Sequence, residues 1–276
     1  MRIALFTRLP PLLAGIAPLI ERLGHELVGV VTIEGPPGRY GRVPLSSLVE
    51  ARPAGADLLI AENAQRFAPL LASLEPDLAL SGGFPVKIPP AAIAVPRLGI
   101  LNGHPSPLPR YRGPNPIGWA LRNGDPELGF TFHLMDAEID TGPIVLQGSA
   151  PVAAAETADE VIGALFGLWA SLLPEALARV EAGGAGSPQS DETASYAGFF
   201  EPGFVEVDWS RPAEEVHRQV RAWFAAAVPD GVHGPLTELD GERVRVLRTR
   251  LDDRDGGRPV ACGDGRTLWV LETAPV

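Results

Sequence analysis

Three polar side chains in the middle of the chain form the set of groups most able to do chemistry. Asn102 and His104 stand two residues apart in the run L-N-G-H-P-S-P-L-P-R-Y-R-G-P-N-P-I-G-W at 101–119. Asp140 lies in the run G-F-T-F-H-L-M-D-A-E-I-D-T-G-P-I at 129–144. An amide can hold a carbonyl oxygen as it becomes negative, an imidazole can move a proton, and a carboxylate can orient that imidazole. Acyl transfer to an amine needs these functions, so the sequence predicts an enzyme.

Strand and helix patterns alternate along the first half of the chain. Short apolar runs predict strands at residues 2–7, 25–33, 77–81, 98–102 and 129–135. Helical spacing predicts helices at 9–23 and 63–74, and a Pro/Gly-rich stretch predicts a loop at 34–55. This alternation predicts an α/β fold with a Rossmann-like, doubly wound, mostly parallel sheet, whose sites lie beyond the carboxyl ends of the strands. Asn102 and Asp140 then fall directly after strands.

The second half of the chain predicts a long helix followed by a small domain. Thr157 is the expected N-cap of a helix at 157–183, which the pair Gly183-Gly184 ends. The patterns that follow predict a short strand, a helix and hairpin-type β segments at 205–209, 211–224, 236–251 and 258–273. We therefore expect a catalytic domain at 1–182, a linker at 183–204 and a mainly β C-terminal domain at 205–276.

Composition and charge limit the cellular setting and the partners. The apolar share of 45% and the charged share of 21% are typical of globular proteins. A single cysteine, Cys262, precludes an internal disulfide and suits a reducing compartment. Arg8, Pro10 and Pro11 interrupt the apolar N-terminus before a signal peptide would be complete. We therefore expect a cytoplasmic protein that has no membrane partner.

The spacing of the polar residues resembles the signature of the 10-formyltetrahydrofolate-dependent formyltransferases. The matching pattern is Asn102-x-His104-x-Ser106-x-Leu108-Pro109-x-x-Arg112-Gly113, followed by Asp140-Thr141-Gly142. The resemblance implies that 10-formyltetrahydrofolate donates a formyl group to an amine. It implies that Asn102 holds the oxyanion, that His104 accepts or relays the proton of the amine, and that Asp140 orients His104. It also implies an OB-like fold for the C-terminal domain.

The resemblance assigns further residues to the binding of the two substrates. The loop at 82–89 resembles the pterin-binding segment of the family. The implied folate-binding residues are Gly83, Phe84, Val86, Lys87, Ile88, Met135, Asp136, Ile139 and Asp140. Ser106, Arg112 and His133 are the expected acceptor-binding residues, although Ser106 between two prolines also suits a loop cap and His133 also suits a core histidine. No metal site is expected.

The charge of the chain bears on which amine accepts the formyl group. The net charge is −11, and residues 203–276 hold 10 Arg against 13 Asp and Glu. Since phosphate backbones are bound by basic surfaces, we expect a small-molecule amine such as an amino sugar or N-hydroxyornithine. Methionyl-tRNA is the alternative, with Arg39, Arg42, Arg110 and Arg112 as a local basic patch.

Two other functions use the same residues. Hydrolysis of 10-formyltetrahydrofolate, with water as the acceptor, is compatible with the same three polar side chains. A catalytically idle folate-binding module is disfavoured, because it has no chemical reason to keep Asn102, His104 and Asp140. The oligomeric state does not follow from the sequence.

Overall fold

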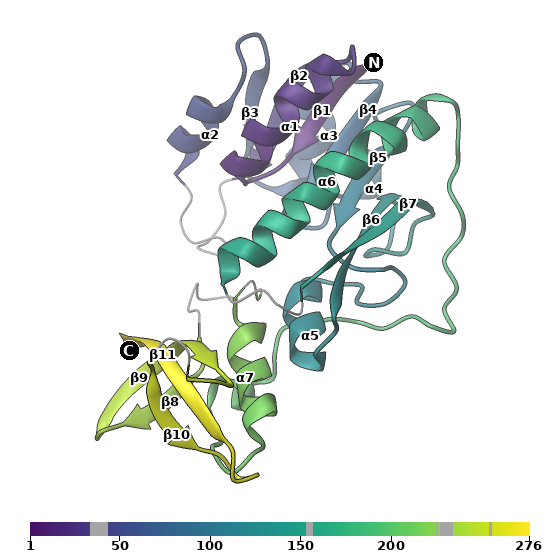
Figure 1. Cartoon of the computed structure of the whole chain (residues 1–276). Coiled ribbons are helices and arrows are strands. Elements are labelled where there is room, and N and C mark those ends of the chain that lie inside the picture. The colour runs from purple at the N-terminus through teal and green to yellow at the C-terminus, as the bar shows by residue number, and fades with distance from the viewer. Residues whose placement is uncertain (34–43, 153–156, 225, 227–233, 254–255) are drawn as a thin grey trace.

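The computed structural model describes residues 1–33, 44–152, 157–224, 226, 234–253 and 256–276. Within these residues, seven strands form one sheet in the order β3-β2-β1-β4-β5-β6-β7, and four form a second in the order β10-β11-β9-β8 (Figure 1). Strands β1 to β5 run parallel, whereas β6 and β7 run antiparallel. The small sheet is antiparallel throughout. The expected fold class, a Rossmann-like sheet with a small β domain after it, is confirmed.

The bounds of the elements are as follows. The strands of the large sheet are β1 (Arg2–Phe6), β2 (Glu26–Ile33), β3 (Asp57–Ala61), β4 (Leu78–Gly82), β5 (Ile100–His104), β6 (Glu127–Leu134) and β7 (Ile144–Pro151). The strands of the small sheet are β8 (Leu236–Leu239), β9 (Glu242–Arg250), β10 (Arg258–Ala261) and β11 (Thr267–Pro275). The helices are α1 (Pro10–Arg22), α2 (Leu45–Ala51), α3 (Phe67–Ser73), α4 (Pro90–Ile93), α5 (Pro116–Asn123), α6 (Ala158–Glu181) and α7 (Ala213–Ala222), with 3₁₀ turns at Ala64–Arg66 and Pro202–Val205.

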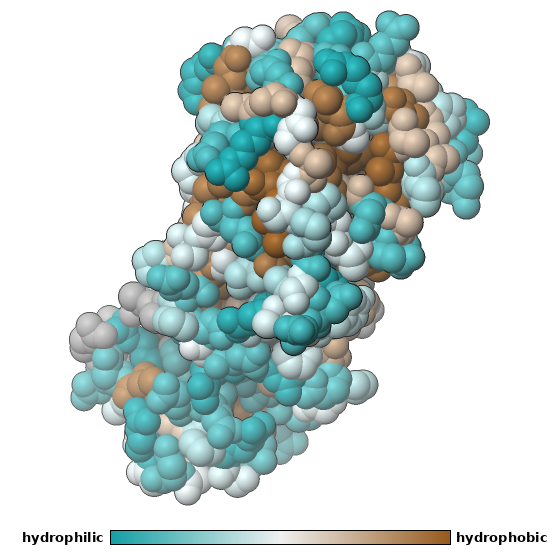
Figure 2. All heavy atoms as spheres, turned by 90° about the vertical axis from the view of Figure 1, so that its right-hand side faces the viewer, coloured by the Kyte–Doolittle hydropathy of each residue, from teal (hydrophilic) through white to brown (hydrophobic). Residues whose placement is uncertain are grey.

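Helices cover both faces of the large sheet. Along β1, Ile3 and Leu5 point into one core with α1 and α6, whereas Ala4 and Phe6 point into a second core with α3 and α4. Alternating side chains of a strand point to opposite faces, so a continuous apolar run fills both cores. In the view of Figure 2, hydrophobic side chains gather on the large domain, and the C-terminal domain is mostly hydrophilic.

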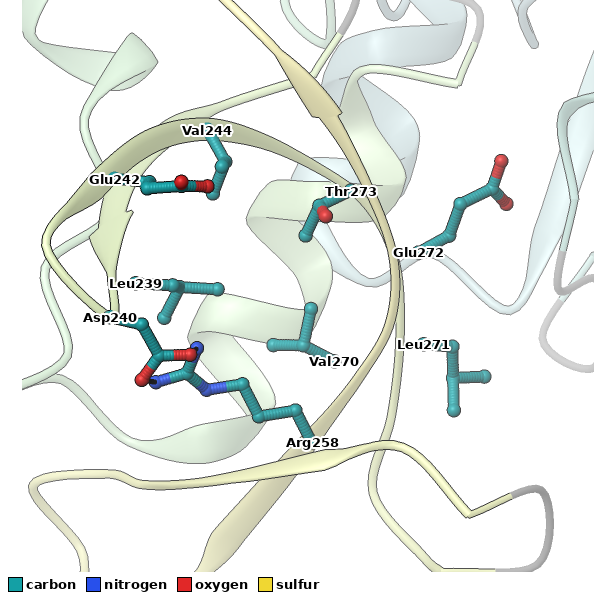
Figure 3. A pocket seen from close by; sticks show the side chains of 9 residues that line it. All are labelled: Leu239, Asp240, Glu242, Val244, Arg258, Val270, Leu271, Glu272 and Thr273. Atoms are coloured by element: carbon teal, nitrogen blue, oxygen red, sulfur yellow. Dashed lines mark hydrogen bonds and ion pairs between the residues drawn. The ribbon is translucent and has the colours of Figure 1, made fainter.

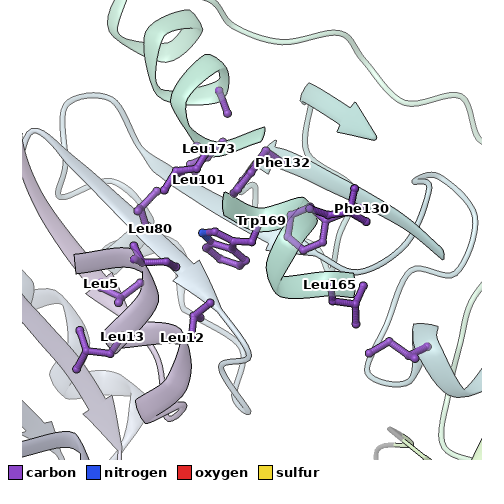
Figure 4. Packing of buried hydrophobic residues seen from close by; sticks show 14 of the residues in the cluster. Leu5, Leu12, Leu13, Leu80, Leu101, Phe130, Phe132, Leu165, Trp169 and Leu173 are labelled. Atoms are coloured by element: carbon purple, nitrogen blue, oxygen red, sulfur yellow. The ribbon is translucent and has the colours of Figure 1, made fainter. Parts of the chain in front are cut away.

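Trp169 of α6 fixes the position of this helix over the sheet. Its indole packs edge-on against Phe130 and Phe132 of β6 (Figure 4). It also lies over two glycines: a Cβ built at Gly103 would approach the ring to 2.2 Å, and one at Gly82 to 2.3 Å. Gly103 separates Asn102 from His104, so the packing of the indole determines how the end of β5 lies under α6.

The long helix α6 begins as the sequence predicts. The Thr157 hydroxyl accepts from the Glu160 backbone N–H, and the Glu160 carboxylate accepts from the Thr157 N–H, which is a capping box. By length and composition α6 is apolar enough to cross a membrane. However, it packs on β6, β7 and α1, and a row of its side chains from Val161 to Val180 is buried there. These contacts are those of a core helix.

Several elements differ from the sequence predictions. The loop expected at 34–55 gives way to α2 and leads into β3, an edge strand that the sequence did not indicate; residues 34–43 lie outside the described residues. The strand β3 is short and borders only β2, so its pairing, rather than an apolar pattern of its own, makes it a strand. The strand β7 was not expected either, because its exposed side chains alternate only weakly with buried ones.

Two other predictions about local structure are wrong. Asn102 lies inside β5 and not after it, because β5 stays paired with β4 and β6 as far as Gly103 and His104. The strand expected at 205–209 is absent from the described residues there: a 3₁₀ turn ends at Val205, and Glu206 makes a single bridge to Leu236. Proline and glycine at the start of this turn favour the tight turn over an extended strand. The division of the chain at residues 183 and 205 stays a prediction.

Replacing Gly103 should test the packing of Trp169. We expect Gly103→Ala to destabilise the fold by about 1–3 kcal/mol, because the added methyl overlaps the indole and forces a shift. Gly163→Ala in α6 is the matched control. Its added Cβ meets no atom of the described chain within 4 Å, and alanine in a helix gains about 0.5–1 kcal/mol over glycine. Urea denaturation measures both variants, and an equal stability for both would contradict the packing argument.

Candidate active site

Three buried polar side chains and one partly buried carboxylate lie together at the carboxyl end of β5. We call Asn102, His104, His133 and Asp140 the polar cluster. Asn102 faces His133 across the antiparallel pair β5–β6, and their Nδ2 and Nε2 atoms lie 3.1 Å apart. Asp140 comes from the connection between β6 and β7. Its Oδ2 lies 3.5 Å from His104 Nδ1, and its Oδ1 lies 3.6 Å from His133 Nε2. The fold therefore brings together the three residues that the sequence predicted as catalytic.

A backbone carbonyl fixes the ring of His104. Its Nε2 lies 2.9 Å from the carbonyl oxygen of Tyr111. A carbonyl oxygen only accepts, so Nε2 carries a hydrogen and Nδ1 faces the Asp140 carboxylate. A second proton at Nδ1 makes an imidazolium whose two N–H groups both have an acceptor. The arrangement therefore favours the charged ring and makes Nδ1 the atom that gains and loses a proton.

His133 belongs to the polar cluster and was not identified as part of it from the sequence. Its Nδ1 lies 3.2 Å from the carbonyl oxygen of Leu134, and its Nε2 lies 3.1 Å from Asn102 Nδ2 and 3.6 Å from Asp140 Oδ1. His133 thus orients the amide of Asn102, and its expected role in acceptor binding stays a prediction. Only the antiparallel register of β6 against β5 would have revealed this contact.

The carboxyl of Asp140 is ionised at neutral pH. Its burial by itself raises the pKa, but the interactions with His104 and His133 and a hydrogen bond from the Gly113 N–H outweigh burial and lower the pKa to about 2. The Gly113 nitrogen lies 2.8 Å from Oδ2. Asp140 also has a left-handed backbone, with φ 56°. The aspartate is therefore a fixed negative charge beside His104.

The other two residues expected to bind the acceptor make contacts within the protein. The Ser106 hydroxyl donates to the carbonyl of Arg110 at 2.8 Å, so it closes the loop, as the alternative interpretation of this serine proposed. The Arg112 guanidinium donates to Gln189 Oε1 and to the Asp191 carboxylate. Roles for Ser106 and Arg112 toward an acceptor stay predictions.

The expected folate-binding residues lie on two loops that approach each other. Lys87 after β4 pairs with Glu138 after β6 at 3.7 Å. Phe84, Val86 and Met135 pack partly buried against one core cluster, Ile88 is buried within that cluster, and Ile139 is exposed. Gly83 turns the first loop with φ 57°, and Asp136 accepts from the Thr141 hydroxyl in the second. The loops thus offer half-buried apolar side chains near the polar cluster, and contacts with folate stay predictions.

A hollow in the C-terminal sheet lies away from the polar cluster (Figure 3). Its lining includes the ion pair of Asp240 with Arg258 and the apolar side chains of Leu239, Val244 and Val270. None of the predicted site residues lines it. In the part of the chain that the structure describes, no cluster of His, Cys, Asp and Glu side chains is arranged to hold a metal ion.

Comparison with known proteins matches both parts of the chain. A family model described as formyl transferase matches residues 48–177, and one described as formyl transferase, C-terminal domain, matches residues 201–275. A methionyl-tRNA formyltransferase of Pelobacter propionicus is 34% identical over 258 residues, which are 91% of this chain and 79% of the relative. One from Pseudomonas putida is 35% identical over 263 residues, or 87% and 81% of the two chains.

Solved structures with low identity share the fold. HypX from Aquifex aeolicus in complex with tetrahydrofolic acid superposes with a TM-score of 0.72 at 20% identity, over 99% of this chain and 44% of HypX. A sugar N-formyltransferase from Shewanella sp. FDAARGOS_354 gives a TM-score of 0.67 at 19% identity, over 89% of this chain and 96% of that enzyme.

Acid should weaken the contribution of Asp140 to stability. The folded-state pKa of about 2 lies below the usual 3.8, so the charged form stabilises the fold above about pH 4 and this stabilisation is lost as the pH falls toward 2. We expect the difference in unfolding free energy between wild type and Asp140→Asn to shrink by about 2 kcal/mol over that range. Urea denaturation from pH 6 to 2 measures it, with Asp57→Asn at the exposed start of β3 as control. A constant difference would contradict the pairing.

Proposed function

The chain belongs to the formyl transferase family, and from this we propose that it transfers the formyl group of 10-formyltetrahydrofolate to the amino group of methionyl-tRNA. The observation that carries the chemistry is the polar cluster, in which an amide, an imidazole and an ionised carboxylate meet. The choice of methionyl-tRNA as the acceptor rests on the names of the sequence relatives. Tetrahydrofolic acid in HypX, and folinic acid in an N-formyltransferase from Helicobacter canadensis, support a folate donor.

In the proposed reaction, the amine nitrogen attacks the formyl carbon of the donor. The new C–N bond forms, the carbonyl oxygen becomes negative, and Asn102 donates one N–H of its NH₂ group to it while His133 contacts the same NH₂ group. The amine loses a proton to Nδ1 of His104, which Asp140 keeps aligned. The bond from the formyl carbon to N10 of the folate then breaks, and the proton passes to N10. Formylated amine and tetrahydrofolate leave.

The pH dependence of the rate is expected to come from His104, because Asp140 stays ionised. Because the pKa of Asp140 is lowered to about 2, this group stays ionised from pH 5 to 9 and does not shape the rate profile. His104 must be neutral at Nδ1 to accept the proton, so the rate should rise with pH through an apparent pKa of the pair. An ionised neighbour moves that apparent pKa upward, and Asp140→Asn should therefore move it downward.

Two observations bear on methionyl-tRNA as the acceptor. The sequence relatives named as methionyl-tRNA formyltransferases cover most of this chain, so they favour tRNA over the small amine expected from the charge. On the C-terminal sheet, β9 carries Arg243, Arg245, Arg248 and Arg250 within eight residues of an acidic protein. Arg243 pairs with Glu206 and Arg250 with Asp252, so tRNA phosphates would have to replace these partners.

The basic patch expected from the sequence is not supported by the contacts of its members. Arg110 pairs with Asp125, and Arg112 pairs with Asp191, so both guanidinium groups have acidic partners within the protein. Arg39 and Arg42 lie outside the described residues.

A small-molecule amine is the second candidate acceptor. The net charge of −11 favours it, and sugar N-formyltransferases share the fold at TM-scores of 0.67. Hydrolysis of the donor with water as acceptor uses the same polar cluster and predicts turnover without any amine.

Replacement of the cluster residues tests the chemistry. We expect Asn102→Ala to lower kcat by about 100- to 1,000-fold through loss of the oxyanion donor. His104→Ala and Asp140→Asn should each lower it by about 100-fold or more through loss of the base or of its orientation. Release of tetrahydrofolate from 10-formyltetrahydrofolate measures turnover, with the exposed Gln65→Ala as control. Full turnover by both Asn102→Ala and His104→Ala would refute the proposed roles.

A competition between acceptors tests the choice of amine. We expect aminoacylated initiator tRNA to be formylated at micromolar concentration and its binding to weaken as salt rises, because phosphate contacts release counterions. Amino sugars and N-hydroxyornithine should give no product at the same concentration. Replacing Arg243 and Arg245 by Gln should raise the KM for tRNA and leave that for the folate unchanged. Formylation of a small amine alone, with no salt-sensitive tRNA binding, would favour the second candidate.

A further inference from the structure

The segment expected to be a linker contacts the loop that follows β5 and the connection between β6 and β7. We call residues 186–198 the crossing segment. It leaves the end of α6 and runs along the side of the large sheet toward α5 and α7 (Figure 1). Ser187 exchanges two backbone hydrogen bonds of 2.8 Å with Ile144 at the start of β7. Farther along, Ala197 and Ser195 exchange backbone hydrogen bonds with Arg112, next to the carbonyl that holds His104.

Within the crossing segment, Gln189 contacts the backbone that carries Asp140. Its Nε2 donates to the carbonyl oxygen of Asp140 at 2.9 Å and to that of Gly142 at 2.8 Å. Its Oε1 accepts from Arg112 Nε at 3.1 Å. Rotating the amide by half a turn would set its oxygen against two carbonyls and its NH₂ against a guanidinium. All three contacts therefore fix the same orientation of the side chain.

The backbone around Asp140 needs such support. The residue has φ 56°, a left-handed conformation that L side chains rarely adopt and that costs about 1–2 kcal/mol. At Gly142 a Cβ would lie 1.8 Å from the Leu134 carbonyl oxygen, so the connection returns very close to the end of β6. Gln189 donates to two carbonyl groups of this connection, those of Asp140 and Gly142, and so bridges them.

We propose that Gln189 is a positioning residue for formyl transfer. It holds the left-handed turn so that the Asp140 carboxylate stays between His104 and the Gly113 N–H, and Arg112 holds Gln189 in turn. The inference rests on the proposed role of Asp140 in orienting His104. Gln189 touches neither the reacting atoms nor the two histidines, so its effect must pass through the position of the carboxylate.

The chain offers a matched control. Gln219 of α7 also donates Nε2 to two backbone carbonyls, those of Phe204 at 2.7 Å and Glu206 at 2.9 Å, but it lies at the C-terminal domain. Methionine has the length of glutamine and no hydrogen-bonding amide. Gln189→Met and Gln219→Met therefore each lose two donated bonds of the same kind, and Gln189→Met also loses the bond accepted from Arg112. Only Gln189→Met should change catalysis.

The expected results separate positioning from stability. Gln189→Met should lower kcat about 10- to 100-fold, leave the KM for 10-formyltetrahydrofolate within about threefold, and move the rising limb of the rate profile to lower pH, as Asp140→Asn does. Gln219→Met should keep the wild-type kcat and profile. Gln189→Leu also removes the NH₂ group and adds no charge. It should behave like Gln189→Met, and it provides the test if the methionine variant does not fold.

A measurement without turnover distinguishes this inference from the proposed function. NMR titration of ¹⁵N-labelled imidazole follows the proton at Nδ1 of His104 in the absence of substrates. We expect its titration to shift to lower pH in Gln189→Met and Gln189→Leu and to stay in place in Gln219→Met. An unchanged titration and unchanged kcat in the Gln189 variants would overturn the inference. If the wild type transferred no formyl group, the function would fail, and the shift would still decide the role of Gln189.

Discussion

The buried pairing of the Asp140 carboxylate with His104 is the interaction on which the site depends. A carboxylate out of water is unfavourable unless charges and donors face it, and here His104, His133 and the Gly113 N–H do so strongly enough to hold its pKa at about 2. The same carboxylate faces Nδ1 of His104, while the Tyr111 carbonyl accepts from Nε2 at the other side of the ring. The imidazole therefore has one reactive nitrogen, Nδ1, and one fixed ring orientation.

Holding this pair in place constrains much of the catalytic domain. His104 lies at the end of β5. The distance between this end of the strand and α6 is set by the close contact of Gly103 with the Trp169 indole. Asp140 sits in a connection without helix or strand, and its left-handed backbone is tied to the crossing segment through Gln189. The hydrophobic core thus positions His104, whereas Asp140 is positioned by polar contacts with Gln189, 49 residues farther along the chain.

The sequence predicted the buried parts of the fold better than the site's supports. Apolar runs predicted β1, β2 and β4, because strands buried on both faces have a pattern that does not depend on their neighbours. The edge strand β3 owes its form to pairing, which leaves no local signal. Asn102, His104 and Asp140 came from a spacing that resembles a family. The contacts of His133 and Gln189 depend on the register of β6 and the path of the crossing segment, and neither can be read locally.

The chemistry and the choice of acceptor are carried by different parts of the molecule. Every amine attacks the same formyl carbon, loses the same kind of proton and leaves the same oxyanion, so the polar cluster serves a tRNA and an amino sugar equally well. Discrimination must come from contacts with the rest of the acceptor. Arg110 and Arg112, which follow β5 in the same loop as Tyr111, are bound to acidic partners within the protein. The arginines of β9 lie on the small C-terminal sheet, where Arg243 and Arg250 also have acidic partners. Selection of a polyanionic acceptor at β9 would leave the electrostatics of the Asp140 pair undisturbed.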